Sequence, residues 1–305
     1  LDFMNKAQDV IRDKELMKEN QITCLMALKK DKSEIEPIVH DLLTIYPENG
    51  DYFDIIEKLY TDENGLKLEE YITKLLSLKD ELKSHYAHVR ALELMDLNDS
   101  RFKPLLIEHL DPLLIKGAPA TYMTIREFSP DKLNFAREYV ETELLTSEKL
   151  PITSIPIAHL FIAHVYGFSG NLDKAIEHID IGHKHTPTVL ELISWKARFL
   201  SKFGRISQSV EYGRQLREYD PNDRNANIQL VKELFLQGQR KEAEYQAILF
   251  SGEESGKPLI YETQFNKYYL QSAYSALRCN DYEFALKLYN GILTHFEEYR
   301  RNEYN

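Results

Sequence analysis

The chain has 305 residues, of which 43% are hydrophobic and 29% charged, so it can bury a sizeable core and wholesale disorder is excluded. Its 38 Lys and Arg against 49 Asp and Glu give a net charge of −11, which disfavours sequence-specific nucleic-acid binding but allows local basic patches. No stretch approaches the roughly 18 uncharged apolar residues of a membrane span. Cys24 and Cys279 have no neighbouring Cys or His pair that suggests zinc, so reduced thiols in the cytosol or nucleus are expected.

Residues 1–150 have helical periodicity without a strict repeat, and we expect degenerate helical repeats there. Apolar stripes with helical spacing run through residues 15–47, 52–60 and 66–97. In the segment KGAPATYMTIREF, Gly117 is expected to end one helix and Pro119 to start another. Because no run alternates apolar and polar residues over the length of a strand, a sheet is not expected.

Residues 151–250 carry the strongest signal, a repeat of 34 residues. Three glycines mark it, each in a short polar turn between two apolar-periodic segments: Gly170, Gly204 and Gly238. Glycine can end a helix at positive φ, so each turn is expected to join the two helices of one unit. Small residues five positions later mark where the second helix approaches the first: Ala175, Ser209 and Ala243. Three tetratricopeptide-type units are therefore predicted.

The remaining features of the carboxyl-terminal half depart from this pattern. Gly213 stands where a bulky apolar residue is usual, so the second unit is expected to pack loosely. Residues 251–258, SGEESGKP, are expected to form a polar loop that interrupts the stack. Residues 259–305 are predicted to form a further helix pair with Asn280 in its turn. Its tyrosines serve either inter-helix packing or a partner groove: Tyr268, Tyr269, Tyr274, Tyr282 and Tyr289.

These patterns predict an all-α protein, a tetratricopeptide-type helical-repeat solenoid in which helix pairs stack into a right-handed superhelix. Each pair leaves an apolar face that only a neighbouring pair can cover, so stability comes from stacking. The sequence does not begin with Met, and we expect it to be a fragment of a longer solenoid. The concave face of a solenoid is suited to holding another protein.

Four segments resemble the auxiliary subunit of the N-terminal acetyltransferase A (NatA) complex, in the order in which that family has them. HTPT before an apolar helix and KG-x-P before an aromatic residue lie outside the generic tetratricopeptide consensus. The segments are IYPENGDYFDIIEKLY, KGAPATYMTIREF, NLDKAIEHIDIGHKHTPTVLEL running into WKARFLSKFG, and YLQSAYSALRCNDYEFALKLYNGILTHFEEY. The auxiliary subunit of the related NatB complex is the alternative within this class.

The resemblance implies a non-catalytic subunit that scaffolds a GNAT-fold catalytic acetyltransferase and helps place it at the ribosome for co-translational N-terminal acetylation. It implies a cytoplasmic, ribosome-associated protein, with acetyl-CoA bound only by the partner subunit. The residues agree that the chain is no acetyltransferase itself. Its twelve glycines are scattered, and none opens a strand-to-helix turn that could cradle a pyrophosphate.

A basic stretch is the candidate ligand site. Residues 195–241 contain ten Lys and Arg against five Asp and Glu, a local excess of +5. Arg198 and Lys202 share one face of a helix, where two cations repel unless an anion lies between them. The NatA resemblance implies that this helix lines a pocket for inositol hexakisphosphate, with Arg198 and Lys202 as phosphate contacts and Arg224 as a weaker third. Ser201 stands where the family usually has another basic residue, and a solvated basic face is the alternative.

Five histidines gather in the first clear unit: His159, His164, His178, His183 and His185. None has a Cys or acidic partner at a chelating i, i+4 spacing on its own helix, so no metal site is expected.

A generic peptide-binding adaptor is the alternative from another functional class. Adaptors that clamp carboxylate tails carry Lys and Asn at the fifth and ninth positions of a repeat's first helix. This chain has Leu160 and His164 there, which disfavours such a clamp in the first clear unit.

Overall fold

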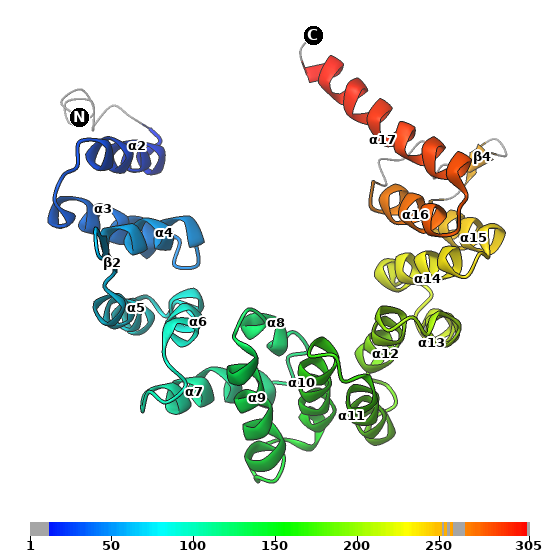
Figure 1. Ribbon diagram of the computed structural model, residues 1–305, viewed down its shortest axis with the longest axis horizontal. Helices are drawn as coiled ribbons and strands as arrows, with labels where there is room; N and C mark the ends of the chain where they lie inside the picture. The colour runs from blue at the N-terminus through cyan, green and yellow to red at the C-terminus, as the bar shows by residue number, and fades with distance from the viewer. Residues whose placement is uncertain (1–11, 252, 255–256, 259–265, 304–305) are drawn as a thin grey trace. The chain divides into compact units, whose positions relative to one another are not determined.

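The computed structural model of the chain describes residues 12–251, 253–254, 257–258 and 266–303. These residues are almost entirely helical (Figure 1), and the chain divides into two compact units, Leu1–Tyr139 and Val140–Asn305. The predicted all-α solenoid of helix pairs is confirmed. Among the described helices, none is both long and apolar enough to cross a lipid bilayer.

The first unit is a series of helices joined by short turns, and neighbouring helices pack against one another from α2 to α4 and from α5 to α8. The helices are α2 (Lys14–Ala27), α3 (Lys32–Ile45), α4 (Gly50–Leu59), α5 (Leu68–Leu82), α6 (His85–Leu94), α7 (Phe102–Ile115), α8 (Thr121–Ile125) and α9 (Pro130–Tyr139). Strands β1 (Thr61–Asp62) and β2 (Gly65–Leu66) form a short hairpin between α4 and α5. Each strand is only two residues long, too short to leave an alternating pattern in the sequence, and Gly65 in the turn supplies a φ of 105°.

Side-chain caps fix where several of these helices begin. The side chains of Asp13, Asn49 and Ser84 accept hydrogen bonds from backbone N–H groups in the first turns of α2, α4 and α6. Glu48 adds a second cap to α6, because its two carboxylate oxygens each accept a 2.8 Å bond from the N–H groups of His85 and Tyr86. The start of α6 is thereby tied to the turn before α4.

The second unit begins with a π-helical turn η1 (Val140–Leu144) and a 3₁₀ turn η2 (Ile152–Ser154), followed by four helix pairs. The pairs are α10 (Ile155–Phe168) with α11 (Leu172–His185), α12 (Leu190–Lys202) with α13 (Ile206–Tyr219), α14 (Arg224–Leu236) with α15 (Arg240–Ser251), and α16 (Asn266–Arg278) with α17 (Tyr282–Glu303). Within a pair the helices pack along their length, and α11 and α13 each contact the first helix of the next pair.

The turn glycines behave as their spacing predicts. Gly170, Gly204 and Gly238 adopt φ angles of 100°, 79° and 79°, and Asn280 occupies the corresponding turn of the last pair at 59°. The small residues after these turns, Ala175, Ser209 and Ala243, are fully buried where the two helices of each pair meet.

Two packing expectations are wrong. Leu230 of α14 lies so close to buried Gly213 that a Cβ on the glycine would be 3.2 Å from its Cδ1 atom, so packing there is tight and not loose. The polar segment at residues 251–258 does not interrupt the stack either, because α16 packs directly on α14 and one buried apolar cluster runs from Val210 to Leu288. Strands β3 (Glu253–Glu254) and β4 (Lys257–Pro258) pair within that segment, and its residues 252 and 255–256, like residues 259–265, lie outside the described part.

Some tyrosines of the last helix pair serve inter-helix packing, and others are exposed to solvent. Tyr268 and Tyr269 are buried and belong to the apolar cluster, with Tyr289 partly buried against it. Tyr274 and Tyr282 are exposed by 52% and 64% of their surface, so they do not take part in inter-helix packing.

Candidate functional site

The predicted phosphate contacts lie beside an aromatic cluster between α10 and α12. The ring of Trp195 meets His164 edge-on at a centroid separation of 4.3 Å and packs against Phe199 at 5.5 Å and Phe168 at 5.8 Å. Burial, together with the charge of Arg198, lowers the pKa of fully buried His164 to about 3. His164 is therefore an uncharged ring inside the cluster at neutral pH.

Two cations rest on rings of this cluster. The Cζ atom of Arg198 lies 4.9 Å from the ring centroid of Trp195, and the Nζ atom of Lys202 lies 4.6 Å from that of Phe168. Lys202 also approaches the carbonyl oxygen of Gly167 at 3.5 Å. The structure thus places Arg198 and Lys202 one turn apart on α12, against a single aromatic surface.

The guanidinium of Arg198 is partly buried and, within the described part of the chain, lacks a hydrogen-bond acceptor for one of its N–H groups. Its burial lowers its pKa, and Asp223 at the start of α14 is the charge that partly offsets this effect. Its Nε atom is buried, and among the described residues no acceptor takes a hydrogen bond from it. A buried guanidinium N–H without an acceptor costs free energy, which an incoming anion could recover.

Arg224 and Ser201 have different surroundings. Arg224 is the exposed first residue of α14, directly after the capping Asp223, and so lies on a different helix from Arg198 and Lys202. Ser201 donates a 2.6 Å hydrogen bond to buried Glu233, whose pKa is raised by burial. Ser201 therefore links α12 to α14 and adds nothing to the basic surface.

Ion pairs cancel much of the local positive charge that the sequence showed. Acidic residues from outside residues 195–241 pair with four of the ten cations: Asp180 with Lys196, Asp173 with Arg205, Glu242 with Arg214, and Asp281 with Arg240. Within the described part of the chain, Arg198, Lys202 and Arg224 have no such ion pair. The excess charge is thus smaller than the sequence count and includes the three predicted residues.

The histidines come together across helices. His159 on α10 and His178 on α11 have their Nδ1 atoms 3.1 Å apart, and the Nε2 of His178 lies 3.6 Å from Glu141 on η1. Burial and the neighbouring His178 lower the pKa of His159 to about 4. His185 instead contacts Thr186. Over the described residues, no group of three or more His, Cys, Asp or Glu side chains is arranged to hold a metal ion.

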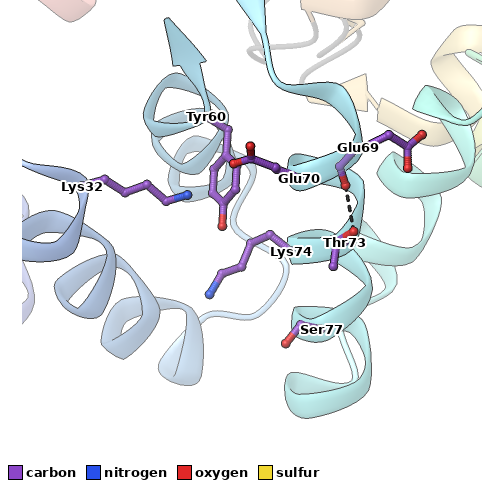
Figure 2. Close-up of a pocket in the computed structure, with 7 residues that line it drawn as sticks. All are labelled: Lys32, Tyr60, Glu69, Glu70, Thr73, Lys74 and Ser77. Carbon is purple, nitrogen blue, oxygen red and sulfur yellow. Dashed lines mark hydrogen bonds between the residues drawn. The ribbon is translucent and has the colours of Figure 1, made fainter.

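A second candidate site lies in the first unit, in a pocket of about 510 Å³ beside α3 and α5 (Figure 2). Figure 2 shows the Lys32 side chain ending beside the ring of Tyr60, and Lys74 extending below that ring from a different helix. The Nζ atom of Lys32 lies 3.0 Å from the ring centroid of Tyr60, and Lys74 pairs with Glu36 at 2.7 Å. The wall carries Lys32 and Lys74 against Glu69 and Glu70, and the adjacent Glu36 pairs with both lysines, so the pocket has no excess positive charge to attract an anion.

The family model for the "N-terminal acetyltransferase A, auxiliary subunit" matches residues 1–305 of this chain. The chain belongs to the NatA auxiliary-subunit family. This NatA auxiliary chain is 27% identical to "N-terminal acetyltransferase A complex auxiliary subunit NAA15" of Arabidopsis thaliana over its whole length, which is 36% of that protein. It is 25% and 24% identical to "N-alpha-acetyltransferase 16, NatA auxiliary subunit" of Mus musculus and Homo sapiens, again over 36% of each.

The fold of the NatA auxiliary chain also has a solved counterpart. A chain of the complex described as "Structure of Naa15/Naa10 bound to HypK-THB" superposes with a TM-score of 0.85, at 19% identity, over 98% of this chain and 46% of that one. The auxiliary chain thus spans about a third of the length of the curated relatives and shares the fold of that solved chain.

The spacing of residues along the NatA auxiliary chain did not predict several of the side-chain clusters that the structure forms. Lys32, Lys74 and Glu36 meet across α3 and α5, which only the packing of two helix pairs brings together. The pairing of His159 with His178 had a usable signal, because antiparallel helices joined at Gly170 bring together residues at similar distances from that turn.

Proposed function

We propose that this chain is part of the non-catalytic auxiliary subunit of a NatA complex, where it scaffolds a GNAT-fold catalytic acetyltransferase. The family match over residues 1–305 carries the proposal. The likeness of the fold to a chain of the Naa15/Naa10 complex supports it, because a stacked helical solenoid offers an extended surface to a folded partner. In this proposal the partner subunit alone binds acetyl-CoA and transfers the acetyl group.

The complex is proposed to act in the cytoplasm, at the ribosome, on emerging polypeptides. A chain with a net charge of −11 has to approach ribosomal RNA through local basic surfaces. Such contacts release counterions, so ribosome association is expected to weaken steeply as salt rises.

Inositol hexakisphosphate is proposed as a structural ligand of Arg198 and Lys202, with Arg224 as a weaker contact. The unmatched Nε donor of Arg198 and the lack of ion pairs at these residues within the described part of the chain favour this reading over a solvated basic face. The partly buried surroundings strengthen charge-assisted bonds to phosphate.

Purification of the tagged full-length protein from its source cells, followed by mass spectrometry, tests the main proposal. A GNAT-fold acetyltransferase in near-stoichiometric amount is expected, together with ribosomal proteins that are lost at high salt. Chaperones bearing acidic carboxyl-terminal tails, without any acetyltransferase, would identify a peptide-binding adaptor instead and would overturn the proposal.

A further inference from the structure

A cavity of about 320 Å³ in the first unit holds polar groups that the proposed function does not use. It lies among the carboxyl-terminal end of α5, the start of α6 and α7, and its wall includes His88 and His109, which are 6% and 5% exposed. This volume is at the lower end for sites that hold small molecules, so the cavity suits a ligand of few atoms.

The hydrogen bonds of the two histidines fix their tautomers. His88 Nε2 lies 2.9 Å from the carbonyl oxygen of Leu105, which can only accept, so Nε2 carries the proton. His109 Nε2 lies 2.8 Å from the hydroxyl of Thr124, which already donates to the Thr121 carbonyl and therefore accepts from His109. In the neutral ring of each histidine, Nδ1 is then a bare acceptor.

Both rings are neutral at physiological pH. Burial lowers the pKa of His88 and, with the nearby His88 and His85, lowers that of His109 to about 4. The rings meet edge-on with centroids 5.3 Å apart. The cavity wall therefore carries two neutral imidazole rings in contact, each with one nitrogen that can accept a hydrogen bond.

Lysines on the same wall are positively charged hydrogen-bond donors. Lys79 is held by Asp80 at 3.1 Å and Glu108 at 2.7 Å, whereas Lys83 and Lys116 have no ion pair among the described residues. Three lysines against two carboxylates give the wall a net charge of +1 before any histidine is protonated. The N-terminus of α6 contributes no anion site, because Glu48 already accepts its free N–H groups.

We propose that this cavity binds a small zwitterion, one molecule with an ammonium group and a carboxylate, as in a free amino acid or a dipeptide. The ammonium donates to Nδ1 of His88 and of His109, and the carboxylate lies between Lys83 and Lys116. A simple anion leaves both Nδ1 acceptors without a donor. A simple cation meets a wall that is already positive.

Isothermal titration of the full chain with three dipeptide probes tests the proposal. Glycylglycine is expected to bind saturably, and N-acetylglycylglycine and glycylglycinamide, which lack one charge each, are expected to bind at least tenfold more weakly. Tetraglycine, whose carboxylate is displaced from its ammonium, is also expected to bind more weakly. Equal binding of any capped or lengthened probe, or no glycylglycine binding at about 10 mM, would overturn the proposal.

Single substitutions test which cavity residues contact the carboxylate and the ammonium group of glycylglycine. Lys83→Gln is expected to weaken glycylglycine binding at least tenfold, and Lys29→Gln is the matched control, since both lysines follow a helix with a φ of 56° and 52° and Lys29 lies outside the cavity. His109→Gln retains a donor for Thr124 but loses the ring Nδ1, and is expected to weaken binding similarly. Unchanged binding in either cavity variant contradicts its assigned role.

A measurement on the unmodified chain covers the case in which a variant fails to fold. In ¹⁵N NMR spectra, glycylglycine is expected to shift the unprotonated Nδ1 resonances of His88 and His109, whereas N-acetylglycylglycine leaves them in place. Resonances that respond equally to both probes, or to neither, contradict the proposed ammonium contact.

Discussion

The Cα of Gly167 lies so close to the ring of Phe199 that a Cβ built on the glycine would be 2.4 Å from two ring carbons. This approach lets α10 pack against α12 and positions the aromatic surface on which Lys202 and Arg198 rest. Glycine at this buried helical position is therefore needed for its lack of a side chain, since its φ is ordinary.

The first prediction concerns that contact. Gly167→Ala is expected to destabilise the chain by about 1–3 kcal/mol, because Phe199 is buried and has to move. Gly291→Ala is the control: it is also inside a helix, but its added Cβ meets Tyr269 at an ordinary 3.4 Å, so no loss is expected. Urea unfolding measures both, and a Gly167→Ala variant as stable as wild type would show that the ring has room to shift.

The second prediction concerns acid stability. The pKa of His164 is about 3 in the folded chain against 6.5 in the unfolded chain, so between these values the unfolded state binds the extra proton. The contribution of neutral His164 to the free energy of unfolding is expected to be fully present above pH 6.5. Below that pH it is expected to fall by about 1.4 kcal/mol for each pH unit. His164→Phe should make the acid limb of a pH series of urea unfolding shallower. His185→Asn, at an exposed position, should not; equal slopes in all three chains would contradict a neutral buried His164.

The third prediction concerns inositol hexakisphosphate. The double variant Arg198→Ala/Lys202→Ala in the assembled complex is expected to lose affinity by more than tenfold, since each charge-assisted hydrogen bond contributes about 1.5–3 kcal/mol. Lys241→Ala removes one exposed cation of the same stretch and is expected to change affinity little. Calorimetric titration at two salt concentrations distinguishes the two; equal losses in both variants would indicate a diffuse basic face.

The fourth prediction concerns the pocket of Figure 2. Burial and the carboxylate of Glu36 raise the pKa of Tyr60 to about 12, so Tyr60 stays protonated where free tyrosine ionises. Its tyrosinate absorbance, taken as the difference between wild type and Tyr60→Phe, should appear about two pH units late. Glu36→Gln is expected to lower that midpoint. A Tyr60 that titrates near 10 in the folded chain would contradict the burial of this residue, which is 8% exposed.

The sequence was sufficient for features that depend on local backbone chemistry. Positive φ at Gly170, Gly204, Gly238 and Asn280 followed from their place in polar turns, because few residues adopt that conformation without strain. The small residues after these turns likewise followed from spacing alone. These features sufficed to predict the helical solenoid.

Features that depend on packing between elements could not be predicted. Leu230 fills the space beside Gly213, and α16 packs on α14 despite the polar segment at residues 251–258. Neither contact can be recognised from the spacing of residues in the sequence. The charge of residues 195–241 was overestimated because Asp180 and Asp281, among others, reach it from elsewhere in the chain. The Nε2 partners of His88 and His109 depend on tertiary contacts in the same way.

Reconstituted acetyl transfer distinguishes a non-catalytic scaffold from a catalytic subunit. The full-length auxiliary protein, the co-purified GNAT-fold subunit and their complex would each be assayed with acetyl-CoA and a peptide bearing a free amino terminus. No transfer is expected from the auxiliary protein alone, and the complex is expected to transfer acetyl groups faster than the GNAT-fold subunit alone. Transfer by the isolated auxiliary protein, or a complex no more active than its catalytic subunit, would contradict a non-catalytic scaffold.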